Sequence, residues 1–201
     1  DGCVDNGLEK QQAEDIFSLI NKFAGYGFNK SHSSRYAFVA FQTAYLKQYW
    51  PVEFMASLLT YEKGDQTKAK EYFKECKAMG IDILPPDINE SFVDFKAAYD
   101  SEEDRKNKHG KIRFGLGAIK GLGEKAIEKI IQAREECGGF TGLYHFCENV
   151  DLRAVTKQSI EALVKAGAFD RLGASRAQFY EAVEPAVRAG QTAQADKLSG
   201  Q

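Results

Sequence analysis

Residues 118–126 read AIKGLGEKA, so two glycines flank one apolar residue just before a helical pattern. Glycine lets a chain turn tightly and lets its backbone approach a phosphate closely, because no Cβ intervenes. The first backbone N–H groups of a helix have no partner within that helix, and the helix dipole favours an anion beside them. This stretch therefore predicts a hairpin between two helical segments, with a phosphate site at its tip.

The pattern resembles the helix-hairpin-helix motif, in which Gly-apolar-Gly is followed three residues later by the first core position of the second helix. Leu122 is expected to pack between the two helices, and the lysines to add charge around the anion. A Cβ at Gly123 would hinder the phosphate, and would strain the backbone if φ there is positive. A plain turn between helices remains the alternative. The candidate DNA contacts are Lys120, Gly121, Leu122, Gly123, Lys125 and Lys129.

A second and weaker copy follows. Residues 160–165 have helical spacing, Gly167 and Ala168 begin a second hairpin, and Ser175 is a good N-cap for the next helix. Asp170 stands where a glycine is expected, so this copy is degenerate. Gly167 and Ala168 are nevertheless candidate DNA contacts. Because phosphate contacts carry no base information, tandem hairpins predict binding to duplex DNA without sequence preference.

The remaining pattern predicts a mainly α protein with a small β-hairpin element. Apolar spacing predicts helices over 11–24, 36–46, 51–59 and 69–80, and residues 36–46 are apolar nearly all round, which is typical of a buried helix. Residues 93–97 alternate like a strand, and 112–114 form a strand-like return after a long polar loop. Two prolines at 85–86 force extended backbone, so we expect a domain boundary over 81–86. The small polar residues 189–201 predict a frayed tail.

The N-terminal half contains GYGFNKSH at residues 25–32. A glycine turn precedes Lys30, Ser31 and His32 at the start of a predicted helix, where an anion can bind. Lys30 and His32 could contact a triphosphate or a nucleic-acid backbone. Equally, the three residues could serve only as surface and capping residues.

Four segments in this order resemble the bacterial C-family replicative DNA polymerases, the DNA polymerase III alpha subunits. They are FAGYGFNKSHS at 23–33, YWPVEFMA at 49–56, ILPPDIN at 83–89 and GLGAIKGLG at 115–123. The resemblance extends to about residue 200. It implies a fragment with four parts: the C-terminal part of the polymerase fingers (1–80), a connecting β element (81–114), a tandem helix-hairpin-helix module (115–190) and a polar tail (191–201).

The resemblance also implies what the fragment lacks. The family extends a primer with two Mg²⁺ ions held by palm aspartates, which would lie upstream of Asp1. No catalytic residue, metal ligand or cofactor is therefore expected in this chain, and we expect no activity of its own. Lys30, Ser31 and His32 become the candidates for the incoming nucleoside triphosphate. The expected partners are duplex DNA, that nucleotide in the parent, and other replisome subunits through regions outside the chain.

Composition agrees with a folded cytoplasmic protein. The 201 residues are 43% apolar and 28% charged, with a net charge of −2. No membrane span or secretory signal is apparent, so no membrane partner is expected. The four cysteines form no disulfide framework, which favours reduced thiols. Cys137, His145 and Cys147 lack the fourth ligand that a structural zinc site needs.

Two other classes of protein also contain helix-hairpin-helix motifs. Helix-hairpin-helix DNA glycosylases follow the hairpin with a Gly-Pro-Asp segment, whereas residues 138–140 here are GGF, without the catalytic Asp. A protein-interaction scaffold stays open, because residues 111–201 carry 13 cations and 11 carboxylates, a weak positive excess. The salt dependence of duplex binding would separate this scaffold from a DNA-binding module.

Overall fold

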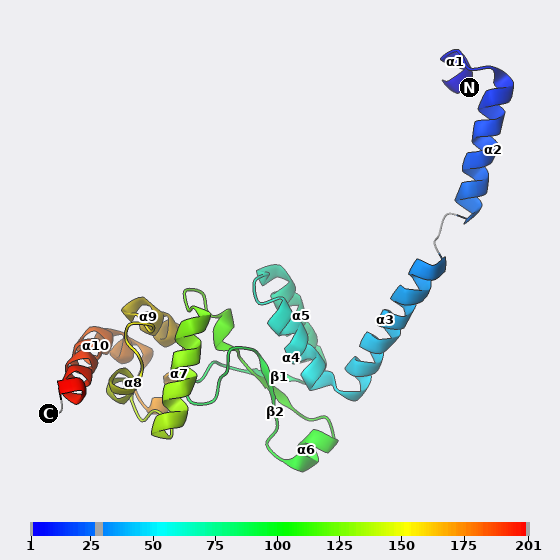
Figure 1. Ribbon diagram of the computed structural model, residues 1–201. Helices are drawn as coiled ribbons and strands as arrows, with labels where there is room; N and C mark the ends of the chain where they lie inside the picture. Colours follow the sequence, from blue (N-terminus) through cyan, green and yellow to red (C-terminus); the bar gives the residue numbers. More distant parts are fainter. Residues whose placement is uncertain (1, 27–29, 200–201) are drawn as a thin grey trace. The chain divides into compact units, whose positions relative to one another are not determined.

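The computed structural model describes residues 2–26 and 30–199 (Figure 1). They divide into two units, residues 1–48 and 49–201, which are described separately. The elements are α1 (Gly2–Asp5), α2 (Lys10–Tyr26), α3 (Lys30–Tyr49), α4 (Pro51–Tyr61), α5 (Gln66–Ala78), β1 (Asp82–Leu84), β2 (Lys96–Ala98), α6 (Glu102–Lys106), β3 (Lys111–Arg113), η1 (Leu116–Ala118), α7 (Glu124–Cys137), α8 (Leu143–Asn149), α9 (Lys157–Ala166), η2 (Asp170–Leu172) and α10 (Arg176–Ser199). The chain is thus mainly α with a small β element, as predicted.

The first unit consists of α1, α2 and nearly all of α3. The helix predicted over 36–46 is present within α3, but the prediction that it is buried is wrong for the described residues. Phe38 is 63% exposed and Phe41 is 66% exposed. A helix that is apolar all round needs a partner on every face, and the described residues of this unit do not supply one.

The second unit begins with α4 and α5 packed on a three-stranded sheet in the order β1-β3-β2. Strands β2 and β3 are antiparallel and pair Ala97 with Ile112, which confirms the predicted hairpin, and α6 lies in its loop. Strand β1 pairs in parallel with β3, and Asp82 lies opposite Lys111. The sequence pattern identified residues 81–86 as extended but not as a strand of this sheet.

The boundary expected over 81–86 differs from the division in the structure, which falls between Gln48 and Tyr49. Val52, Met55 and Leu59 of α4 are buried in the same cluster as Ile112 of β3. The chain also passes from α5 into the sheet without a linker, because the N–H of Ile81 donates to the carbonyl of Cys76 at 2.8 Å. Residues 49–80 therefore fold with the β element.

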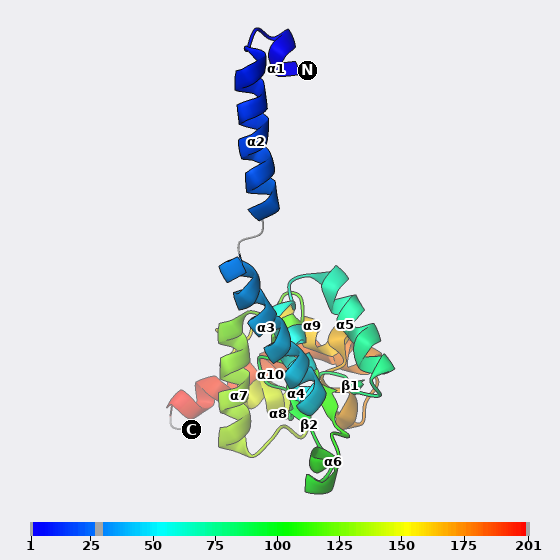
Figure 2. The same ribbon diagram turned by 90° about the vertical axis from the view of Figure 1, so that its right-hand side faces the viewer.

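Helices α7 to α10 surround a second core, and α10 packs along α8 and α9 (Figures 1 and 2). Phe146 and Phe169 are fully buried at its centre, with ring centroids 5.2 Å apart in an edge-to-face arrangement. Such aromatic pairs stabilise a core by about 0.5–1.5 kcal/mol beyond their burial. This core supports both predicted hairpins.

The frayed tail predicted from residue 189 onward is wrong as far as Ser199, because α10 continues to that residue. Gly190 lies against α8 so closely that a Cβ would meet the carbonyl oxygen of Cys147 at 2.4 Å. Gln194 Nε2 donates to the carbonyls of Cys147 and Val150 at 3.0 and 2.8 Å. The small polar residues therefore continue the helix, because they fit against the end of α8 and satisfy its carbonyls.

Candidate nucleic-acid interface

The first hairpin joins η1 to α7 through residues 119–123. Gly121 has a φ of +89°, a left-handed conformation that favours glycine. Leu122 is 8% exposed and packs in the core with Ile119 and Ile127, and its N–H donates to the carbonyl of Ile119 at 3.2 Å. The prediction that Leu122 packs between the two helical segments is confirmed, although the first segment is only one 3₁₀ turn.

The start of α7 has unsatisfied backbone donors. Its N-cap residue is Gly123, and no side chain caps it. The N–H groups of Ala126 and Ile127 both donate to the carbonyl of Gly123, at 3.0 and 3.1 Å. Within residues 2–26 and 30–199, the N–H groups of Gly123, Glu124 and Lys125 donate to no protein acceptor. Three free amides at the positive end of a helix dipole can bind one phosphate.

Gly123 itself has φ −82° and ψ 152°, which any residue adopts, so the left-handed conformation lies at Gly121 instead. A Cβ built on Gly123 meets no heavy atom within 4 Å. The backbone at Gly123 is therefore open to a ligand, and the fold does not require glycine at this position.

The three lysines predicted for this site are all exposed on the hairpin and the first turns of α7. Lys129 Nζ donates to the side-chain oxygen of Gln132 at 2.9 Å. Among the described residues, neither Lys120 nor Lys125 forms an ion pair, and Glu124 is the one acidic residue in the first turn of α7. The structure thus leaves five of the six predicted contacts exposed on the hairpin and the first turns of α7, whereas Leu122 is buried and serves the core.

The second hairpin differs from the prediction. Ala168 is 1% exposed, its N–H donates to the carbonyl of Leu163, and its carbonyl accepts from the N–H of Ile88. Gly167 is also buried, and the guanidinium of Arg176 lies so close that a Cβ there would meet Nη2 at 2.3 Å. These two backbones face the protein, so Gly167 and Ala168 are left out of the interface.

Asp170 explains why the backbone of the second hairpin is not accessible to a phosphate. Its carboxylate accepts from Arg176 Nη2 at 2.6 Å and from Nε at 2.9 Å, which holds the guanidinium over the turn. The start of α10 also differs from that of α7, because a side chain caps it: the N–H of Gln178 donates to Ser175 Oγ at 3.3 Å, and the N–H of Ser175 donates to Gln178 Oε1 at 2.9 Å. The departure from glycine at 170 was the signal for this difference.

A loop at residues 87–92 positions α7, and sequence reasoning assigned it no role. Arg134 of α7 is 8% exposed, and its Nη1 donates to the carbonyl of Ser91 at 2.7 Å while its guanidinium lies over the Phe92 ring, 4.9 Å from the centroid. Burial lowers the pKa of Arg134 from its ordinary value. Asn89 donates to the carbonyl of Phe140 and accepts from its N–H, at 2.8 and 2.7 Å. These bonds hold the C-terminal end of α7, and the segment that follows it, against the loop.

The candidates for the nucleotide lie at the start of α3, in the first unit. Lys30 is the first residue of α3, and Ser31 and His32 are exposed. The His32 ring lies 4.4 Å from that of Tyr36, measured between centroids. The part of the motif at residues 27–29 lies outside the described residues. The structure thus keeps the three candidates together on one helical turn.

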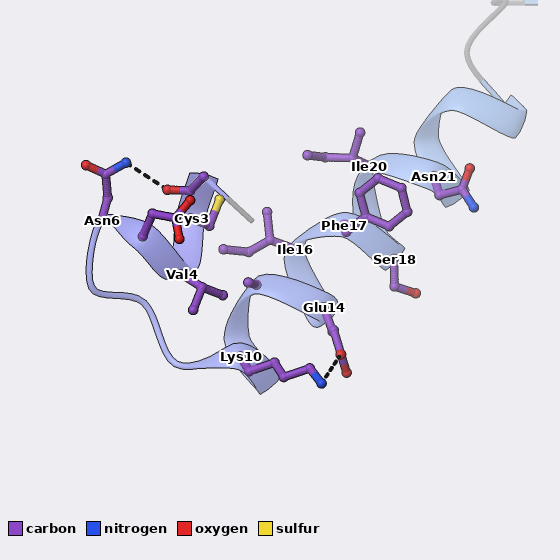
Figure 3. A pocket seen from close by; sticks show the side chains of 13 residues that line it. Cys3, Val4, Asn6, Lys10, Glu14, Ile16, Phe17, Ser18, Ile20 and Asn21 are labelled. Atoms are coloured by element: carbon purple, nitrogen blue, oxygen red, sulfur yellow. Dashed lines mark hydrogen bonds and ion pairs between the residues drawn. The ribbon is translucent and has the colours of Figure 1, made fainter.

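Other features of the chain offer weaker sites. A hollow of about 880 Å³ lies between α1 and α2 (Figure 3), but Ile16, Phe17 and Ile20 make it largely apolar, and its Lys10 pairs with Glu14 at 3.9 Å. The described residues contain no cluster of three or more His, Cys, Asp or Glu side chains that could hold a metal. Burial raises the pKa of the Cys147 thiol to about 12 and that of Cys76 to about 11, so both stay protonated. None of the described helices has the length and hydropathy of a membrane span.

Comparison with known proteins agrees with the geometry of the first hairpin. A family model described as a helix-hairpin-helix motif matches residues 80–179. The DNA polymerase III subunit alpha of Vibrio cholerae is 46% identical over 189 residues, which are 94% of this chain and 16% of that protein. The same subunit of Escherichia coli is 42% identical over 189 residues, again 94% and 16%. That of Haemophilus influenzae is 41% identical over 201 residues, or 100% of this chain and 17% of that protein.

The chain therefore spans about 16% of the length of these relatives, and the similarity covers nearly all of the chain. It includes the residues of the first hairpin as well as those at the start of α3. By this similarity, the chain belongs to the family of the bacterial DNA polymerase III alpha subunits.

Proposed function

We propose that this chain is the part of a DNA-directed DNA polymerase that holds duplex DNA by its phosphate backbone through the first hairpin. The observation that carries the proposal is the uncapped start of α7. Three free amides occur there together, between the exposed Lys120 and Lys125. The match to a helix-hairpin-helix family over residues 80–179 supports it.

The chemistry of this hairpin suits a phosphodiester. Backbone amides donate to a phosphate oxygen whatever the neighbouring base, so this contact fixes the position of DNA without reading its sequence. The lysines strengthen the contact by displacing counterions. A replicative polymerase must move along DNA of any sequence, and a sequence-independent grip meets that need.

The start of α3 is proposed to contact the phosphates of an incoming nucleoside triphosphate through Lys30, Ser31 and His32. Membership of the polymerase family supports this role, together with the grouping of the three residues at a helix start. The Mg²⁺ ions and carboxylates of nucleotidyl transfer would belong to parts of the parent outside this chain. Contacts with other replisome subunits and a cytoplasmic location belong to the same proposal.

The test is a titration of the chain with fluorescent duplexes of unrelated sequence at increasing salt, followed by anisotropy. We expect equal affinities for all sequences, and a log–log slope against salt of about −0.9 per neutralised phosphate. Absence of salt-dependent duplex binding would instead favour the protein-interaction scaffold. The same titration with a matched RNA duplex would show how far the grip depends on the shape of the DNA helix.

A further inference from the structure

A hollow in unit 49–201, separate from the one between α1 and α2, combines cations with aromatic rings. Its volume is about 240 Å³, and it lies where the start of α4 meets the loop that carries α6. Most of its lining is cationic or aromatic: Tyr49, Trp50, Tyr99, Arg105, Lys106 and Lys108. The hairpin at residues 119–123 does not line it, so it is a separate site.

The cations face this hollow because of the order of charges along α6. Its three carboxylates stand in the first turn, whereas Arg105 and Lys106 stand in the last turn and line the hollow. Lys108 lies two residues after the end of α6, with its ammonium 5.0 Å from the centroid of the Tyr49 ring. The hollow is thus cationic although the loop as a whole has mixed charge.

One carboxylate, that of Glu53, also lines the hollow. Its Oε1 accepts a hydrogen bond from the hydroxyl of Tyr99 at 2.8 Å, so part of its charge is already engaged by the protein. Three cations in the same lining outnumber it. The hollow therefore retains a net positive charge that suits a phosphate.

Two aromatic rings at the rim are accessible. Tyr49 is 49% exposed and Trp50 is 48% exposed, and their ring centroids lie 6.1 Å apart with planes tilted by 57°. Exposed rings beside cations are the surface on which unpaired bases stack while the backbone follows the charge. A base pair within a duplex does not present its face in this way.

We propose that this hollow binds one nucleotide unit of single-stranded DNA, with the phosphate against Arg105, Lys106 and Lys108 and the base stacked at Tyr49 and Trp50. The volume is below the roughly 300–1,000 Å³ of typical small-ligand pockets, which suits a phosphate and its sugar with the base outside. The choice of DNA rests on the proposed function, since a polymerase meets unpaired template as well as duplex. The hollow adds a second point of contact to the hairpin.

Trp50 is the only tryptophan of the chain, so its fluorescence reports directly on this site. The experiment titrates the 201-residue chain with an oligothymidylate of about eight nucleotides. We expect saturable quenching of Trp50. An Arg105→Ala/Lys106→Ala variant should bind roughly tenfold more weakly, with a salt slope smaller by about 0.7 for each cation lost.

The matched control is Lys70→Ala/Lys74→Ala, which removes two exposed cations from α5, away from the hollow. It should retain the affinity of the unchanged chain. Circular dichroism of each variant confirms that the fold is intact. The proposal would be overturned if both double variants bound the oligomer with equal affinity. It would also be overturned if the oligomer bound without changing the fluorescence of Trp50.

Two further measurements are needed. One distinguishes a DNA strand from a free nucleotide as the ligand, and the other distinguishes failure of this inference from failure of the proposed function. Thymidine monophosphate at the same nucleotide concentration should quench Trp50 far less. If it quenched with the same affinity as the oligomer, the ligand of the hollow would be a free nucleotide, and the proposal of single-stranded DNA would be overturned. Anisotropy of a labelled blunt duplex tests the first hairpin independently. Duplex binding without single-strand quenching would refute this inference alone, whereas quenching without duplex binding would refute only the proposed function.

Discussion

Replacing Gly123 by Ala should weaken duplex binding while leaving the fold intact. The backbone at Gly123 has φ −82° and ψ 152°, and the new methyl group would meet no protein atom within 4 Å. Alanine reduces the entropy of the unfolded chain but is a poorer N-cap than glycine, and these two effects are small and opposite. We therefore expect the free energy of unfolding to change by less than about 1 kcal/mol.

Binding should respond differently, because the methyl group projects from the backbone that a phosphate must approach. Loss of one charge-assisted hydrogen bond corresponds to about 1.5–3 kcal/mol, or roughly ten- to a hundredfold in affinity. Anisotropy with labelled duplexes of unrelated sequence measures this loss. It should be the same for every sequence, since the contact is with phosphate.

Gly121→Ala is the matched control. Gly121 has φ +89°, where an alanine costs roughly 1–2 kcal/mol, so this variant should lose stability as well as binding. Thermal melting of both variants separates the two effects. Undiminished duplex affinity of Gly123→Ala, with an unchanged melting curve, would refute the reasoning that α7 binds a phosphate through its first amides.

Four other outcomes are expected. Lys120→Ala and Lys125→Ala should each reduce the slope of log affinity against log salt by about one unit, measured by anisotropy; an unchanged slope would remove that lysine from the interface. Lys30→Ala in the longer parent should raise KM for nucleoside triphosphate about ten- to a hundredfold with DNA affinity unchanged; unaltered KM would leave the motif a helix start only. The chain alone should show no primer extension, and metal-dependent incorporation by pure chain would contradict this. Hydrogen bonding from Arg171 lowers the pKa of Glu90, so this pair stabilises the fold above the ordinary glutamate pKa of about 4.3, and the contribution is lost as pH falls through the lowered value. Glu90→Gln should therefore flatten the acid side of the melting temperature plotted against pH, and an unchanged profile would show that the pair is too exposed to matter.

The sequence by itself determined the first hairpin and the helices around it. Gly121, Leu122 and Gly123 act through local backbone freedom and one apolar contact, and the apolar periodicity of α7 to α10 is a property of each segment alone. The antiparallel pairing of β2 with β3 was also predictable, because both strands belong to one hairpin and alternate in polarity. Local rules suffice wherever the partners are close in sequence.

Only the tertiary structure decided the features that depend on partners far apart in the chain. Strand β1 joins the sheet by pairing in parallel with β3, which lies far along the chain, and the tail stays helical because Gln194 reaches the carbonyls of α8. Arg176 closes the second hairpin over Gly167, which the local resemblance to a phosphate site did not reveal. Such contacts depend on how whole elements pack, and the pattern of one segment does not specify which distant side chain will satisfy or cover its backbone.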